Sequence, residues 1–277
     1  MSRLTNCFAA LRAEDRAAFV PFITAGDPDS ETSFEILLKL PEIGADVIEL
    51  GMPFSDPMAD GPAIQASSNR ALDAGMSVKG TLKLVTQFRA QNSETPVVLM
   101  GYYNPIHAYG VSRFVADAKT AGVDGFIVVD LGPEEDEELR GAAKPAGIDV
   151  VRLATPTTDD ARLSTVLKGA GGYLYYVSVA GVTGTKKVPE DEVRAAVQRI
   201  RKSTDLPCAV GFGIRTPDQA SAVARIADAA IVGSAIVSLI GEGVRSGESK
   251  EKIVSETLNY CRGIADAVHN ARIPPPV

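Results

Sequence analysis

The sequence predicts a single (β/α)8 TIM barrel with an additional N-terminal helix. Short apolar segments rich in Val, Ile, Phe and Tyr recur eight times, and longer stretches rich in Ala, Leu and charged residues separate them. The apolar segments are nearly continuous rather than alternating, which is typical of parallel strands that helices cover on both faces. The length of 277 residues, 45% of them hydrophobic, suits one such barrel, which commonly occupies about 250 residues.

The elements follow one another in the order that a barrel requires. An N-terminal helix is predicted over 1–16, and a flexible tail over 270–277, within one domain that spans 1–277. Crossover helices are predicted at 30–42, at 113–121 and at 189–202, the last with Pro189 in its first turn. The predicted strands span 18–24, 46–50, 96–102, 125–129, 149–153, 172–177, 207–212 and 229–232.

Composition excludes several classes of protein. A net charge of -7 and a pI near 5.0 lack the basic surface of a nucleic-acid-binding protein. No apolar run reaches membrane-spanning length, and the first residues contain no signal-peptide core. Cys7, Cys208 and Cys261 are scattered and odd in number, which suits a reducing compartment. We therefore expect a cytoplasmic protein that binds neither nucleic acid nor membranes.

An open doubly wound sheet is the main alternative to the barrel. Its nucleotide-binding fingerprint follows the first strand, but the turn at that place reads ITAGDPDS. The nearest string, GFGIRT at Gly211, comes after the seventh predicted strand and lacks the third glycine, and no GxxxxGK[ST] motif occurs. The sequence thus disfavours both the open sheet and a nucleotide cofactor.

Glycine-rich loops after the last two predicted strands indicate a phosphate site. In barrels these two loops and a short helix N-terminus bind phosphate through backbone N–H groups. Tight-turn geometry alone is the alternative explanation of these glycines. The predicted phosphate contacts are Gly211, Phe212, Gly213, Gly233 and Ser234.

The sequence predicts neither a metal site nor a cysteine nucleophile. The two histidines, His107 and His269, lie far apart and have no partner at ligand spacing. No cysteine has a histidine nearby in the sequence, so we expect all three cysteines to be packing residues.

Carboxyl groups remain for chemistry, and the segment IELGMPFSDPMADGP over 48–62 presents them. Glu49 interrupts an apolar strand, where an uncompensated carboxylate costs several kcal/mol. Prolines and glycines shape the following loop, so Asp60 is predicted to return to the mouth of the barrel as its partner. Alternatively, Glu49 pairs with a structural group, and Asp60 caps a helix that starts at Pro62. Asp56 is predicted to be exposed.

Several segments, in this order, resemble the α subunit of tryptophan synthase: PFITAGDP, ELGMPFSDPMADGP, GYYNPI, GVTGTK, GFGI and GSAIV. The resemblance implies a (β/α)8 barrel that cleaves indole-3-glycerol phosphate to indole and glyceraldehyde 3-phosphate without a cofactor of its own. It also implies an α2β2 heterotetramer, in which indole passes to a β subunit that carries pyridoxal phosphate and makes L-tryptophan.

The resemblance assigns roles to individual residues. Glu49 matches the general acid/base, and Asp60 matches the carboxylate that stabilises the charged indole. The loop over 180–189 would act as a lid, although Val179 and Ala180 stand where many family members carry more polar residues. The implied contacts are Phe22, Ile64, Met100, Ile127, Tyr175 and Thr183 for the substrate, Gly184 for the phosphate, and Pro53 and Asp56 for the partner.

The sequence leaves three alternatives open. Met100 and Ile127 suit ordinary barrel core as well as a substrate site. A different barrel enzyme, such as a sugar-phosphate isomerase or epimerase, would use the same phosphate loops and paired acid/base groups. A partner-binding subunit without catalysis would keep the loop after the second strand as an interface.

Overall fold

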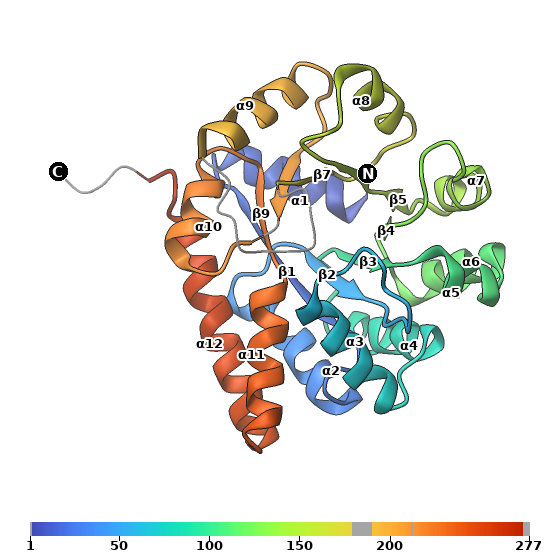
Figure 1. Ribbon diagram of the computed structural model, residues 1–277, viewed down its shortest axis with the longest axis vertical. Coiled ribbons are helices and arrows are strands. Elements are labelled where there is room, and N and C mark those ends of the chain that lie inside the picture. Colours follow the sequence, from blue (N-terminus) through green and yellow to red (C-terminus); the bar gives the residue numbers. More distant parts are fainter. Residues whose placement is uncertain (1, 179–189, 212, 274–277) are drawn as a thin grey trace.

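Parallel strands form the centre of the molecule, and helices form a ring around them (Figure 1). The computed structural model describes residues 2–178, 190–211 and 213–273. Within them the strands are β1 (Ala18–Thr24), β2 (Ile48–Gly51), β3 (Val97–Gly101), β4 (Gly125–Val128), β5 (Asp149–Val150), β6 (Arg152–Ala154), β7 (Leu174–Val177), β8 (Cys208–Gly211) and β9 (Ala229–Val232).

The order of the strands closes the barrel. They pair as β5-β4-β3-β2-β1-β9-β8-β7-β6, and every pair is parallel. The two ends of this order, β5 and β6, are consecutive in the chain and are separated only by Val151. They are halves of the fifth predicted strand: the first half pairs with β4 and the second with β7. The predicted (β/α)8 barrel is therefore confirmed, with one of its eight strands divided.

The helices return the chain from one strand to the next. They are α1 (Arg3–Ala13), α2 (Ser30–Lys39), the 3-10 helix η1 (Pro41–Ile43), α3 (Pro62–Asp73), α4 (Val78–Arg89), α5 (Tyr103–Tyr109), α6 (Val111–Ala121), α7 (Glu137–Ala146), α8 (Asp160–Val166), α9 (Glu190–Arg201), α10 (Pro217–Ala224), α11 (Ser234–Arg245) and α12 (Lys250–His269). Among these described helices, none is long and apolar enough to cross a membrane.

The predicted helices are present with shifted ends. The helix predicted at 30–42 divides after Leu40 because Pro41 has no N–H to donate and its ring disfavours a continuous α-helix. The helix predicted at 113–121 begins earlier, at Val111, directly after Gly110 with φ of 92°. Pro189 and the end of the predicted tail, 274–277, lie outside the described residues.

The N-terminal helix α1 fills one end of the barrel. Leu4, Phe8 and Leu11 are buried together with residues that point inward from the strands. The rings of Phe8 and Tyr173 lie 5.8 Å apart between centroids. The Ser2 hydroxyl accepts the N–H of Thr5 and so begins this helix. Because α1 covers the amino-terminal ends of the strands, the carboxyl-terminal ends form the open mouth.

Three aspartates at the covered end of the barrel tie neighbouring strands together. Asp46, Asp124 and Asp228 come shortly before β2, β4 and β9, and each accepts the backbone N–H of the first or second residue of the strand that precedes its own. These N–H donors are Phe19, Val97 and Cys208, each 2.8 Å from the carboxylate oxygen. Arginines neutralise the carboxylates: Arg16 for Asp46, Arg3 and Arg89 for Asp124, and Arg201 for Asp228.

Candidate active site

Glu49 is buried one layer below the mouth of the barrel. It lies in β2 between Phe22 of β1 and Val98 of β3, and its side chain is 0% exposed. The Tyr173 hydroxyl donates a hydrogen bond of 2.5 Å to its Oε1 atom, whereas Oε2 has no hydrogen-bond partner among the described residues. Burial raises the pKa of Glu49 to about 8, and the bond from Tyr173 opposes this rise only in part. The carboxyl group therefore holds a proton near neutral pH.

Tyr173 was not predicted as a site residue. It lies directly before β7 in the segment GGYLYY, and burial and the neighbouring Glu49 raise the pKa of its phenol well above the usual value. A phenol in an otherwise apolar strand segment needs a buried partner for its hydroxyl, and that need was the signal available in the sequence. Here the partner is Glu49.

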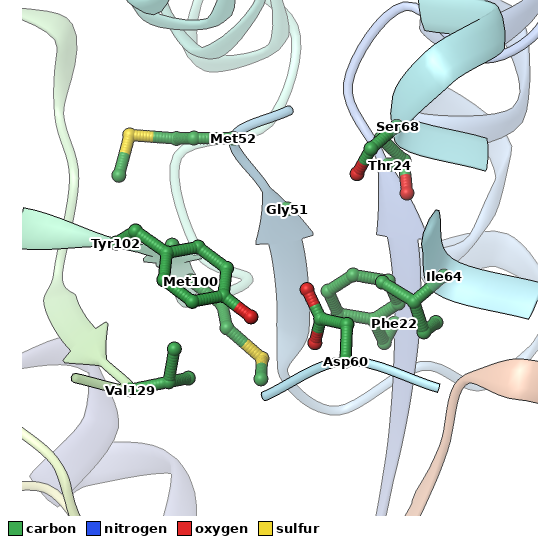
Figure 2. A pocket seen from close by; sticks show the side chains of 11 residues that line it. Phe22, Thr24, Gly51, Met52, Asp60, Ile64, Ser68, Met100, Tyr102 and Val129 are labelled. Carbon is green, nitrogen blue, oxygen red and sulfur yellow. The ribbon is translucent and has the colours of Figure 1, made fainter. Parts of the chain in front are cut away.

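Asp60 lies near the carboxyl end of β2, Glu49's strand, at the end of the loop that joins β2 to α3. Burial raises the pKa of Asp60 to about 6, and the Tyr102 hydroxyl opposes the rise by hydrogen bonding. Figure 2 shows the Tyr102 hydroxyl pointing toward Asp60. The same hydroxyl accepts the N–H of Ala59 at 3.0 Å, which holds the loop close to the end of β3. Tyr102 is the second site residue that sequence reasoning missed, although GYYNPI contained it.

The alternative role of Asp60 as a helix cap is wrong. The helix α3 does begin at Pro62, as that alternative required, but its N-cap residue is Gly61 and no side chain among the described residues caps it. Proline at the first helical position supplies the fixed φ that starts the helix without a capping side chain. The Asp60 side chain instead faces a pocket.

This pocket lies at the carboxyl ends of β1, β2 and β3, where a barrel places its active site (Figure 2). Three of its apolar lining residues, Phe22, Ile64 and Met100, were predicted to contact substrate. Asp60 and Tyr102 provide its titratable groups, and Thr24 and Ser68 add hydroxyls. The other lining residues are Gly51, Met52, Gly101 and Val129.

Other predicted substrate residues lie elsewhere. Ile127 is fully buried in the barrel interior, in register with Met100 of β3, and does not line this pocket, so its position fits the core alternative. Tyr175 lies above Tyr173 on the same side of β7, and its hydroxyl would come within 2.3 Å of a Cβ atom at Gly211. Its pKa is raised well above the usual value by burial and by the nearby carboxyl groups of Glu49 and Asp60. Thr183 lies outside the described residues.

The predicted phosphate loops end β8 and β9. Gly213 has φ of +80° and open space where a Cβ would stand, so this position requires glycine for its conformation. Gly233 is the N-cap of α11, which begins at Ser234 and has no side-chain cap in the part of the chain that the structure describes. The N-terminus of α11 therefore presents backbone N–H groups and a favourable dipole to an anion. Gly184 and Phe212 lie outside the described residues.

The two predicted partner residues differ in exposure. Asp56 is exposed on the loop between β2 and α3, and its carboxylate accepts a hydrogen bond from the Ser55 hydroxyl. Pro53 is already buried within this chain. Met58, which was not predicted, is 81% exposed on the same loop.

A closed ring of parallel strands with a pocket at their carboxyl ends defines a protein of the (β/α)8 barrel class. The family model for the tryptophan synthase alpha chain matches residues 8–269, and this chain belongs to that family. Its fold is similar to tryptophan synthase subunit alpha from Legionella pneumophila strain Paris, with a TM-score of 0.90, 38% identity, and coverage of 98% of this chain and 99% of that one.

A second similar structure is tryptophan synthase from Mycobacterium tuberculosis. Its TM-score is 0.87 at 33% identity, with 97% of this chain and 98% of that chain covered. Family membership implies a lyase-type reaction in tryptophan biosynthesis and a β-subunit partner. No comparison favours a sugar-phosphate isomerase or a subunit without catalysis.

Proposed function

We propose that this chain cleaves indole-3-glycerol phosphate to indole and D-glyceraldehyde 3-phosphate, without a cofactor of its own. The observation that carries the proposal is the state of Glu49: a fully buried carboxyl group with a pKa of about 8, next to a pocket that holds a second carboxyl group. At pH 7 about nine in ten Glu49 side chains carry a proton. The cleavage requires such a proton donor, because carbon 3 of the indole must be protonated before its bond to the glycerol chain breaks.

Glu49 would act twice in the reaction. Its carboxyl group gives a proton to carbon 3 of the indole, which leaves a cation on the ring and a carboxylate on Glu49. The bond between that carbon and the glycerol chain then breaks, and its electron pair restores the aromatic ring. The adjacent glycerol hydroxyl loses its proton to the Glu49 carboxylate and becomes the aldehyde. Glu49 is thereby returned to its protonated form, and a group of this kind contributes about 10² to 10⁴ in rate.

Asp60 would stabilise the cation. With a pKa of about 6 it is ionised in about nine of ten molecules at pH 7, so the two carboxyl groups hold different charges at the same pH. A carboxylate near the indole N–H favours the charged ring over the neutral one. The Tyr102 hydroxyl, which points toward Asp60, favours the ionised form and opposes in part the rise in pKa that burial causes.

The phosphate of the substrate would bind at the start of α11 and at the loop after β8. Backbone N–H groups at Ser234 and the positive end of the helix dipole favour a dianion there, and Gly213 allows the neighbouring loop to approach it. Phe22, Ile64 and Met100 supply the apolar surface for the indole ring. The phosphate and the indole would thus lie over β1, which separates β9 from β2.

A β subunit with pyridoxal phosphate would receive the indole in an α2β2 assembly in the cytoplasm. The exposed loop with Asp56 and Met58 is the proposed contact, because it also carries Asp60 and so links association to the site. Binding of the partner would order this loop and raise turnover. Equal turnover by the isolated chain and by the complex, measured as the β subunit is titrated in, would contradict this link.

Indole release from indole-3-glycerol phosphate by the wild type, Glu49→Gln and Asp60→Asn tests the proposed reaction. Glutamine keeps the size of the side chain and an acceptor for Tyr173 but cannot give up a proton in this way. We expect a loss of about 10² to 10⁴ in kcat for Glu49→Gln. Undiminished release by Glu49→Gln would reject the mechanism, and no release by the wild type would reject the function.

A further inference from the structure

Arg70 joins three segments that approach the mouth of the barrel. It lies in the last turn of α3, and its Nε and Nη2 atoms bind the two carboxylate oxygens of Asp27 at 2.7 and 2.8 Å. Nη2 also donates to the carbonyl oxygen of Val237, in the first turn of α11, at 3.2 Å. The Asp27 side chain is 0% exposed and that of Arg70 is 20% exposed. We call Arg70, Asp27 and the Val237 carbonyl the Arg70 clamp.

Each joined segment carries a different part of the proposed site. The helix α3 follows Asp60 directly and bears Ile64 and Ser68 on the wall of the pocket. The helix α11 presents its N-terminus, at Ser234, as the proposed phosphate site. Asp27 belongs to the loop after β1, and β1 is the strand between β2, which leads to the Asp60 loop, and β9, which leads to α11. The Arg70 clamp therefore connects the helix that follows Asp60 with the helix whose N-terminus is the proposed phosphate site.

The surroundings of the guanidinium leave it little freedom. A Cβ atom at Gly241 of α11 would lie 2.8 Å from its Nη1 atom, so the helix provides room for the group only because this residue has no side chain. On its other side, Asp27 holds the guanidinium in a bidentate pair, whose planar geometry a lysine ammonium cannot reproduce. The position of α11 relative to α3 thus depends on an arginine at this place.

We propose that Arg70 is a positioning residue that sets the distance between the phosphate-binding start of α11 and the carboxylate loop before α3. The inference rests on the proposed function, since the start of α11 and the Asp60 loop must both contact one substrate. Hydrogen bonds from backbone N–H groups to a phosphate weaken steeply when a donor moves by about 1 Å. Loss of the clamp therefore weakens phosphate binding more than it slows the chemistry at Glu49.

A matched control lies at the covered end of the barrel. Arg89 binds Asp124 at 2.5 Å, and the two side chains are 10% and 4% exposed, much like the pair in the clamp. Arg89 also donates to backbone carbonyls, those of Gly122 and Thr95. Arg70→Lys and Arg89→Lys make the same chemical change in buried ion pairs of similar setting. Only the first pair joins elements that carry the proposed site.

The test measures kcat and KM for indole-3-glycerol phosphate, and the Kd of glycerol 3-phosphate by titration calorimetry, for the wild type and both lysine variants. We expect Arg70→Lys to raise KM and Kd about tenfold or more and to change kcat by less than about threefold. Arg89→Lys should leave KM and Kd unchanged, because a loss of folded protein lowers the apparent kcat rather than the affinity. Unchanged KM and Kd in Arg70→Lys, or an equal rise in Arg89→Lys, would overturn the proposal.

A second variant keeps the test decisive if Arg70→Lys does not fold. Gly241→Ala favours a helical backbone and pushes the guanidinium away from α11, so we expect a stable protein with KM and Kd raised about threefold or more. A folded Gly241→Ala variant with the KM and Kd of the wild type would also overturn the proposal that Arg70 positions the phosphate site. A wild type that binds glycerol 3-phosphate but releases no indole would reject the proposed function instead. The Kd values of the wild type and the variants would still test whether Arg70 positions the phosphate site.

Discussion

Three aspartates at the covered end of this barrel, Asp46, Asp124 and Asp228, and the two carboxyl groups of the proposed site, Glu49 and Asp60, have opposite surroundings. At the covered end, Asp46, Asp124 and Asp228 each accept a backbone N–H and pair with at least one arginine. At the mouth, Glu49 has a single hydrogen bond, from Tyr173, and one oxygen without a partner among the described residues. No ion pair with an arginine or lysine is found for Glu49 or Asp60 in the described part of the chain.

This difference in surroundings assigns different roles to the two sets of carboxyl groups: one set stabilises the fold, and the other suits proton transfer. At the covered end, an arginine and a backbone N–H donor satisfy each carboxylate, and the group serves to tie strands together. A carboxyl group buried without a cation keeps its proton to higher pH, which is a cost in free energy but provides a proton donor near neutral pH. Substitutions at the two ends should therefore change different measured quantities.

The largest expected effect is at Glu49. Glu49→Gln should abolish most of the activity, as argued above, and should also change how stability depends on pH. Because the pKa in the folded state is raised from 4.5 to about 8, this group's favourable contribution is complete below pH 4.5 and is lost as pH rises toward 8. The free energy of unfolding of Glu49→Gln relative to the wild type should thus increase by roughly 3 to 4 kcal/mol between pH 5 and pH 8.

Urea unfolding at several pH values measures this change. The exposed Glu42→Gln is the matched control for the chemical substitution. If the difference in the free energy of unfolding between Glu49→Gln and the wild type were constant across this pH range, Glu49 would not be protonated in the folded state. The proposed contrast between the mouth and the covered end would then be wrong.

The next effect is at the covered end. Asp124→Asn removes the charge that Arg89 and Arg3 share and the best acceptor for the Val97 N–H, so we expect a loss of about 3 kcal/mol in the free energy of unfolding. The value of kcat/KM per folded molecule should stay within about twofold. Asp117→Asn is the control, because its pair with Arg113 is exposed, and it should cost no more than about 0.5 kcal/mol.

Activity measured at a temperature well below the unfolding transition separates the two outcomes. If Asp124→Asn lowered kcat/KM while leaving stability intact, the covered end would have a part in the chemistry and the comparison would be wrong.

The fold was predictable because its signals are local and repeated. Apolar runs give seven of the eight barrel strands directly, and only the fifth is divided, because its halves pair with different neighbours. The burial of Glu49 was also predictable, since this residue lies inside an apolar run. The helix start at Pro62 followed from proline's fixed φ, whereas its cap, Gly61, did not, because a glycine cap leaves no side-chain signal.

The remaining parts of the site depend on contacts between residues distant in sequence. Tyr173 reaches Glu49 across 124 positions, and Arg70 reaches Val237 across 167. Nothing in the local pattern distinguishes these side chains from ordinary core or surface residues. The aspartates at the covered end were equally hidden, although each follows a small or apolar residue directly before a strand, a pattern that recurs at Asp46, Asp124 and Asp228.

The smallest predicted effect concerns Asp60. Tyr102→Phe removes the hydroxyl that opposes the rise in the pKa of Asp60, so that pKa should move above its present value of about 6, and a smaller fraction of Asp60 is ionised at pH 7. If ionised Asp60 stabilises the indole cation, the acidic limb of the kcat/KM profile moves to higher pH, and activity falls about threefold at pH 7 but much less at pH 8.5. The neighbouring Tyr103→Phe is the control, because Tyr103 bonds to the exposed Glu138 instead. A Tyr102→Phe profile that drops equally at every pH would mean that the hydroxyl acts only on the loop, through the N–H of Ala59, and that the charge of Asp60 is set by burial alone.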